Sequence, residues 1–129
     1  AEDRVVIHNA VDLANFAPGP PRLASTLRIG IVANFQDVKG HDDFLAMARL
    51  LRDSAVDAKF VLAGEDVVEG GTLGRTKQLA ADLSLTESVD FTGHVRDVPK
   101  LLQSLDIVVS SSRVEPFGRS ILEAMACGI

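Results

Sequence analysis

The sequence contains no tryptophan or tyrosine, a single cysteine, and no apolar run near the roughly 20 residues that a membrane-spanning helix needs. Because Cys127 has no second cysteine with which to pair, no disulfide forms within the chain, which favours a reducing cytosol. Its neighbours are apolar, so we expect Cys127 to be a packing residue rather than a nucleophile. Six phenylalanines are the only aromatic residues apart from histidine, which leaves few platforms on which single-stranded nucleic acid could stack.

An excess of positive charge is also missing. The formal net charge is −5, whereas a general nucleic-acid binder needs a basic surface, so we expect no nucleic-acid partner. Neither a Gly-x-Gly-x-x-Gly fingerprint, a Walker A sequence nor a Gly-x-Ser-x-Gly elbow is present. The three histidines lie far apart without the spacing of metal ligands, so no metal site is predicted.

Apolar, β-branched runs alternate with helical patterns along most of the chain. The strands are expected at residues 27–33, 59–63, 88–92 and 107–110, and the last helix at residues 118–127. Asp97 is a suitable N-cap for a short helix that follows it. The near-continuous apolar strands predict an α/β fold, a doubly wound Rossmann-like parallel sheet with helices on both faces. Residues 1–24, with a proline-rich stretch, are interpreted as a hinge or linker, and residues 25–129 as the domain.

Ligands of such sheets bind beyond the carboxyl ends of the strands. The segments that follow the predicted strands are residues 34–40, 64–66, 93–96 and 110–118. The histidines in or beside these segments, His41 and His94, are expected to be loop residues without a ligand role. Glu65 and Asp66 are expected to be solvated.

Two glutamates, Glu115 and Glu123, flank the turn into the last predicted helix. Between them, the backbone N–H groups at the helix start form a potential site for a diphosphate. A carboxylate on either side could accept hydrogen bonds from sugar hydroxyls. The spacing alone also fits two solvated acids on an amphipathic helix.

Six short segments, in this order along the chain, resemble landmarks of the family 4 retaining glycosyltransferases, which have the GT-B fold. They are Ile7–Asp12 (IHNAVD), Val32–Gly40 (VANFQDVKG), Phe60–Gly64 (FVLAG), Val89–Val95 (VDFTGHV), Asp106–Ser111 (DIVVSS) and Glu115–Gly128, which carries the E-x7-E pattern. The resemblance covers nearly the whole chain and implies the C-terminal, donor-binding half of such an enzyme, cut short at both ends.

The resemblance also implies roles for individual residues. Glu115 and Lys39 would be catalytic, with Glu115 facing the transferred sugar and Lys39 pairing with the diphosphate. Glu123 would bind the ribose hydroxyls. The remaining donor-binding residues would be Phe117, Gly118, Arg119, Asn34, Gly64, Val95 and Arg96.

One departure concerns the diphosphate. Many members carry an arginine five residues before the lysine, where this chain has the neutral Asn34. Either the diphosphate binds more weakly than in those members, or a different arginine, Arg119 or Arg96, contributes the second positive charge. Ala10 replaces the usual glycine of the hinge segment.

The function implied is that of the nucleoside-diphosphate-sugar-binding domain of a retaining hexosyltransferase that needs no metal or other cofactor. A glycan or lipid acceptor would bind to an N-terminal domain that this sequence lacks, so the chain alone is expected to be inactive. The outer edge of the fourth strand is a candidate surface for self-association. The expected location is cytoplasmic, with peripheral association with the inner membrane left open. A sugar-nucleotide epimerase of the same fold and a non-catalytic α/β binding module remain alternatives.

Overall fold

The computed structural model describes residues 4–67 and 71–129, which form a four-stranded parallel sheet with the order β3-β2-β1-β4. The strands are β1 (Leu27–Val32), β2 (Ala58–Ala63), β3 (Val89–Gly93) and β4 (Ile107–Val108). The helices are α1 (His41–Asp53), α2 (Thr72–Asp82), α3 (Val98–Gln103) and α4 (Arg119–Ala126), with 3-10 turns η1 (Asp37–Lys39) and η2 (Thr86–Ser88). The predicted Rossmann-like α/β fold is confirmed.

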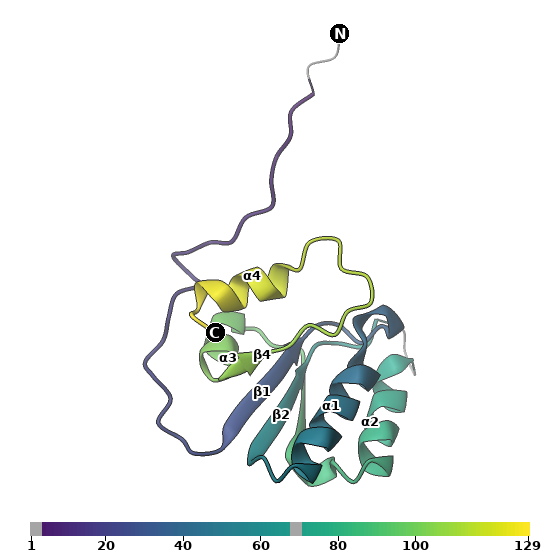
Figure 1. The fold of residues 1–129 in the computed structure, drawn as a ribbon. Coiled ribbons are helices and arrows are strands. Elements are labelled where there is room, and N and C mark those ends of the chain that lie inside the picture. The colour runs from purple at the N-terminus through teal and green to yellow at the C-terminus, as the bar shows by residue number, and fades with distance from the viewer. Residues whose placement is uncertain (1–3, 68–70) are drawn as a thin grey trace.

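Helices cover the sheet on both faces (Figure 1). Alternate residues of a strand point to opposite faces, so Ile29 and Ile31 pack with Phe44 of α1 in one core cluster. Val61 points the other way and packs with Leu102 of α3 and Ala124 of α4. Because the later residues of β1 and β2 are covered on both faces, each strand is apolar without alternation after one charged residue near its start, Arg28 or Lys59.

The element boundaries differ from the predicted ones at the last strand. Val109 still donates from its backbone nitrogen to the carbonyl oxygen of Gly30 at 2.8 Å, but β4 itself contains only Ile107 and Val108. Beyond Val109 the chain turns toward η1, where the hydroxyl of Ser111 donates to the carbonyl of Gly40 at 2.7 Å. The predicted cap is confirmed, since the Asp97 carboxylate accepts from the Lys100 backbone nitrogen at 3.0 Å.

The N-terminal segment forms neither helix nor strand over residues 4–24. Its strand-like run, Val5 to Ile7, is highly exposed and extends away from the sheet (Figure 1). The later part is anchored instead: Gln103 of α3 donates to the Ala17 carbonyl at 2.8 Å, and Arg22 pairs with Asp106 at 3.1 Å. Residues 17–22 are therefore packed against the domain rather than detached from it.

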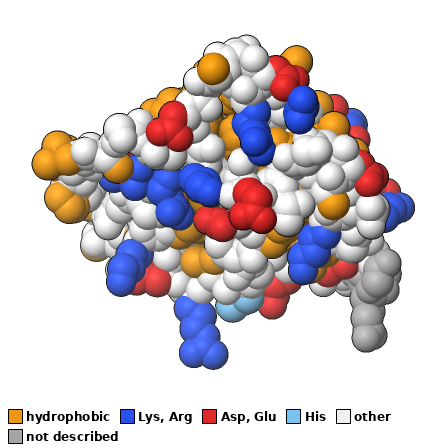
Figure 2. Space-filling view, turned by 90° about the horizontal axis from the view of Figure 1, so that it is seen from below, with side chains coloured by type: hydrophobic (Ala, Val, Ile, Leu, Met, Phe, Trp, Pro, Cys, Tyr) orange, Lys and Arg blue, Asp and Glu red, His pale blue; other side chains and the backbone are white. Residues whose placement is uncertain are grey.

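Charges of both signs are interspersed over the face shown in Figure 2. Charged side chains of the described residues also form ion pairs, for example Arg49 with Asp53 along α1 at 2.8 Å. At the outer edge of the sheet, Ile107 of β4 is 45% exposed. Within the described ranges, no helix is both long enough and apolar enough to cross a membrane.

Candidate functional site

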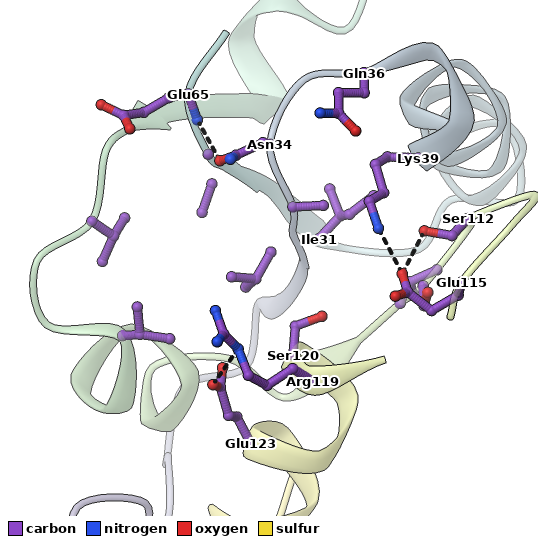
Figure 3. Close-up of a pocket in the computed structure, with 18 of the residues that line it drawn as sticks. Ile31, Asn34, Gln36, Lys39, Glu65, Ser112, Glu115, Arg119, Ser120 and Glu123 are labelled. Carbon is purple, nitrogen blue, oxygen red and sulfur yellow. Dashed lines mark hydrogen bonds and ion pairs between the residues drawn. The ribbon is translucent and has the colours of Figure 1, made fainter. Parts of the chain in front are cut away.

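A pocket of about 510 Å³ lies at the carboxyl ends of the strands, beside the start of α4 (Figure 3). Its volume is within the usual range for small-molecule sites, and its position is the crevice where open parallel sheets bind ligands. Part of the lining is apolar, with Ile31 from β1 and Val109 from the position directly after β4. Polar side chains surround it and come from the segments that follow the strands.

Most of the residues predicted to bind the donor are brought together around this pocket. The lining includes Asn34, Lys39, Gly64, Val95, Glu115, Arg119 and Glu123. Three other predicted residues do not line it: the Phe117 side chain is 46% exposed, Arg96 is also exposed, and Gly118 is buried beneath the turn.

A glycine positions the lysine side of the pocket. Gly40 adopts the left-handed conformation, with φ of 65°, between η1 and α1. A β-carbon at this position would collide with the carbonyl oxygen of Ser111. The missing side chain therefore lets the Lys39 loop lie directly against the segment that follows β4, which continues to Glu115.

Lys39 and Glu115 form the central ion pair of the site. The Lys39 Nζ lies 2.8 Å from Oε2 of Glu115, and the Ser112 hydroxyl donates to the same oxygen at 3.1 Å (Figure 3). The hydrogen bond from Lys39 lowers the pKa of the Glu115 carboxyl, which is therefore ionised at neutral pH.

At the start of α4, one backbone N–H already has an acidic partner in this structure. The backbone nitrogen of Gly118 donates to Oε1 of Glu115 at 3.1 Å. A helix N-terminus stabilises a negative charge, and here the charge of Glu115 fills that role at Gly118. An anion that binds to the Gly118 N–H must therefore displace the Glu115 carboxylate.

Glu123 occupies a different environment from Glu115. Its side chain is 15% exposed, and its charged partner is Arg119, one turn earlier on α4, at 3.4 Å. Desolvation raises the pKa of the Glu123 carboxyl, opposite in direction to the shift at Glu115. A desolvated carboxylate at a pocket wall favours a ligand that brings hydrogen-bond donors, such as a pair of hydroxyl groups.

The side-chain amide of Asn34 has a structural role, because it bonds to the backbone of a neighbouring loop. Its Oδ1 accepts from the backbone nitrogen of Glu65 at 3.2 Å, and Phe35 forms a parallel bridge with Asp66 beside it. The Asn34 side chain therefore joins the loop after β1 to the loop after β2. Gly64 permits this contact, since a β-carbon there would collide with the Ala33 carbonyl.

Two side chains near the pocket depart from the sequence expectations, and a third agrees with them. Asp66 is only partly exposed: its Oδ2 accepts from the Leu73 backbone nitrogen at 3.3 Å, and its Oδ1 is buried. Glu65 is exposed, as expected, and its Oε2 lies 3.3 Å from Nδ1 of His94. His41 is the first residue of α1, not a loop residue, and is 2% exposed.

Several lining residues were not singled out from the sequence. They are Phe16, Gln36, Ser110, Ser112 and Val98. The serines and Gln36 lie in or next to the segments that follow strands, so their position was available as a signal. Phe16 comes from the N-terminal segment, and no spacing in the sequence indicates that it reaches the pocket.

No group of three or more histidine, cysteine or acidic residues within residues 4–67 and 71–129 is arranged to hold a metal ion. The polar groups that line the described pocket are one ammonium group, one guanidinium group, one imidazole, two amides, carboxylates and serine hydroxyls, with the start of α4 beside them. These groups suit a ligand that combines a phosphate with hydroxyls.

Known proteins with similar sequences are glycosyltransferases and a related synthase. The chain is 34% identical over 140 residues to D-inositol 3-phosphate glycosyltransferase of Mycolicibacterium vanbaalenii, covering 95% of this chain and 31% of that protein. It is 36% identical over 96 residues to mannosylfructose-phosphate synthase of Agrobacterium fabrum, covering 70% of this chain and 21% of that protein. The chain thus spans about a third or less of these relatives.

Solved structures agree with the sequence comparison. Anabaena Alr3699/HepE in complex with UDP and glucose superposes with a TM-score of 0.84 at 26% identity, covering 95% of this chain and 35% of that chain. The C-terminal domain of a group 1 family glycosyl transferase, LpcC of Francisella tularensis, gives a TM-score of 0.78 at 28% identity, covering 91% of this chain and 66% of that one. These neighbours are GT-B glycosyltransferases. Residues 23–129 match the family description itself, and the chain belongs to the glycosyl transferases group 1.

Proposed function

We propose that the chain is the donor-binding domain of a retaining glycosyltransferase that transfers a hexosyl group from a nucleoside-diphosphate sugar. The observation that carries the proposal is the meeting of Lys39, Glu115 and Glu123 around one pocket at the carboxyl ends of a parallel sheet. The family membership supports transferase chemistry. It gives no support to the epimerase or the non-catalytic module.

The side chains suggest how the donor is arranged. Lys39 pairs with the diphosphate and stabilises the negative charge that develops on the leaving group during transfer. Glu123, with its desolvated carboxylate, accepts hydrogen bonds from the ribose hydroxyls. Glu115 faces the sugar, and its charge also favours a sugar with oxocarbenium character. Phe117 and Gly118 lie beside this position, and Gly64, Val95 and Arg96 border the base.

This arrangement needs no metal, because Lys39 and the helix start supply the electrostatic stabilisation. The side chain of Arg119 is 79% exposed at the pocket wall, and its guanidinium supplies the second positive charge that the neutral Asn34 does not bring. UDP-glucose is the first donor to test, since Alr3699/HepE was crystallised with it. The retention of anomeric configuration belongs to this proposal.

The acceptor, a glycan or a lipid, would bind to an N-terminal domain linked through residues 1–24, with residues 25–129 forming the donor domain. A pocket without an acceptor domain loses the proximity between the reactants, so the isolated chain is expected to bind donor without useful transfer. The proposed setting is the cytoplasm, with the inner membrane as a site of peripheral association.

A thermal-shift panel with UDP, GDP, ADP and UDP-glucose, each with and without EDTA, and with acetyl phosphate plus magnesium tests the proposal. A ligand that binds only the folded state raises the melting temperature. At a concentration of 100 times its Kd, it adds about 2.7 kcal/mol to the free energy of unfolding. We expect a nucleotide or nucleotide sugar to stabilise the wild type in EDTA, and Glu123→Ala to reduce the shift. Stabilisation by acetyl phosphate with magnesium instead would contradict the proposal and indicate a receiver-like module.

A further inference from the structure

The carboxylate of Glu115 occupies the groups that the diphosphate needs. Its Oε2 accepts from Lys39 Nζ at 2.8 Å and from the Ser112 hydroxyl at 3.1 Å. Its Oε1 accepts from the Gly118 backbone nitrogen at 3.1 Å. An ammonium and a helix N-terminal N–H are the donors that bind phosphate oxygens best in such sites. A diphosphate and the Glu115 carboxylate therefore compete for the same partners.

The pocket offers few other positive groups. Arg119 and Lys39 are the only lysine or arginine residues in the lining within the described ranges, and Arg119 already contacts Glu123 at 3.4 Å. Arg113 is close in sequence, but its guanidinium binds Asp42 at 2.8 Å and Asp43 at 2.7 Å. An arriving diphosphate must therefore draw on Lys39.

We propose that Glu115 is an internal competitor of the diphosphate, which makes tight binding depend on the sugar. When the diphosphate takes Lys39 and the Gly118 N–H, the Glu115 carboxylate keeps the Ser112 hydroxyl but loses its charged donor and its backbone donor, and it faces a second negative charge. The hydroxyls of a bound sugar replace those donors, whereas the hydroxyls of a free nucleoside diphosphate are those of its ribose, which the proposed arrangement places at Glu123. This inference rests on the proposed function of the site.

The consequence for turnover is a preference for the donor over the leaving product. Before transfer, the sugar satisfies Glu115 and the diphosphate holds Lys39. After transfer, the sugar is gone, and Glu115 returns to Lys39 and displaces the nucleoside diphosphate. Because burial is partial, with 21% and 29% of the two side chains exposed, the competition is modest and reversible.

The test is calorimetry with UDP, UDP-glucose and inorganic pyrophosphate on the wild type and on Glu115→Gln. Glutamine keeps the volume and an acceptor oxygen for Gly118 but releases the Lys39 charge. UDP and pyrophosphate should bind roughly two- to fivefold more tightly to the variant, the range expected for a partly exposed ion pair. UDP-glucose should not gain, because the variant loses the charged acceptor for the sugar.

Glu87→Gln is the matched control. Glu87 is exposed, lies outside the pocket, and contributes only its backbone carbonyl to a hydrogen bond with Lys59. The same charge change at Glu87 should leave all three affinities unchanged. A gain of the same size in both variants would mean that net charge alone is responsible, and would overturn the proposal.

The pyrophosphate measurement separates this inference from the proposed function. UDP and pyrophosphate that bind Glu115→Gln no more tightly than wild type would overturn the competition while leaving nucleotide binding in place. Tighter pyrophosphate binding by Glu115→Gln, with no nucleotide bound by either protein, would overturn the proposed nucleotide specificity and support the competition. A melting curve confirms that both variants are folded before titration.

Discussion

Replacing Glu123 with glutamine should separate ligand affinity from stability. The Glu123 side chain is 15% exposed, with Arg119 as its charged partner at 3.4 Å, and desolvation raises the pKa of its carboxyl. The folded state therefore holds a proton more tightly than the unfolded state at this group. Ionisation costs stability as the pH rises from the unfolded pKa of about 4.3 through the folded value. Glutamine avoids that cost.

We therefore expect unliganded Glu123→Gln to be at least as stable as wild type at pH 7, with a gain below about 1 kcal/mol because the group keeps some solvent and a cationic neighbour. The gain should disappear below about pH 4, where both side chains are neutral. Nucleotide affinity should change in the opposite sense. A hydrogen bond from a hydroxyl to a carboxylate contributes about 1.5–3 kcal/mol and one to a neutral acceptor about 1 kcal/mol, so a loss of roughly 0.5–2 kcal/mol, or about 2- to 30-fold in Kd, is expected.

Urea denaturation at pH 4 and pH 7 measures the first effect, and calorimetry with UDP and UDP-glucose measures the second. Glu87→Gln serves again as the control for a lost surface charge, and should change neither quantity. If Glu123→Gln is clearly less stable at pH 7 and binds both ligands as wild type does, Glu123 is a structural residue and the reasoning is wrong. When a residue serves binding at the expense of stability, its substitution raises the free energy of unfolding and weakens ligand binding.

Three further outcomes follow from the geometry of the site. Lys39→Ala should weaken both UDP and UDP-glucose and flatten the salt dependence of their Kd in calorimetry, because a phosphate-facing charge is lost; an unchanged salt slope would place the phosphate elsewhere. Gly40→Ala should lower the free energy of unfolding in urea by at least about 1 kcal/mol, because it strains the left-handed turn and presses on the Ser111 carbonyl; a neutral effect would contradict the described packing. Burial lowers the pKa of His41, whose ring stacks on Phe35 at 4.4 Å, so stability should fall as the pH drops below about 6.5 and less so in His41→Phe. If urea denaturation shows the same change in the free energy of unfolding for wild type and His41→Phe between pH 7.5 and pH 5, that result would count against a buried neutral His41.

The strands and helices were largely predictable because each one carries its own periodic pattern. β2 begins one residue before the predicted start, and α4 lies within the predicted helix. The last strand was predicted too long. Residues 107–110 have the right side chains for a strand, but the hydrogen bonds of Ser111 to the η1 loop draw the chain away from the sheet. A long-range contact of this kind leaves no trace in local propensity.

The sequence by itself determined the fold class and the edge of the sheet at which a ligand would bind. Both follow from apolar periodicity and from the chemistry of short segments, which act over a few residues. Only the tertiary structure decided which groups pair. Lys39 meets Glu115 across 76 positions of the chain, and Asn34 meets the Glu65 backbone across 31. For each donor and acceptor in the site, the sequence contains several possible partners of suitable chemistry. Which of them forms the hydrogen bond or ion pair depends on distances that are set only when the sheet and its loops pack together.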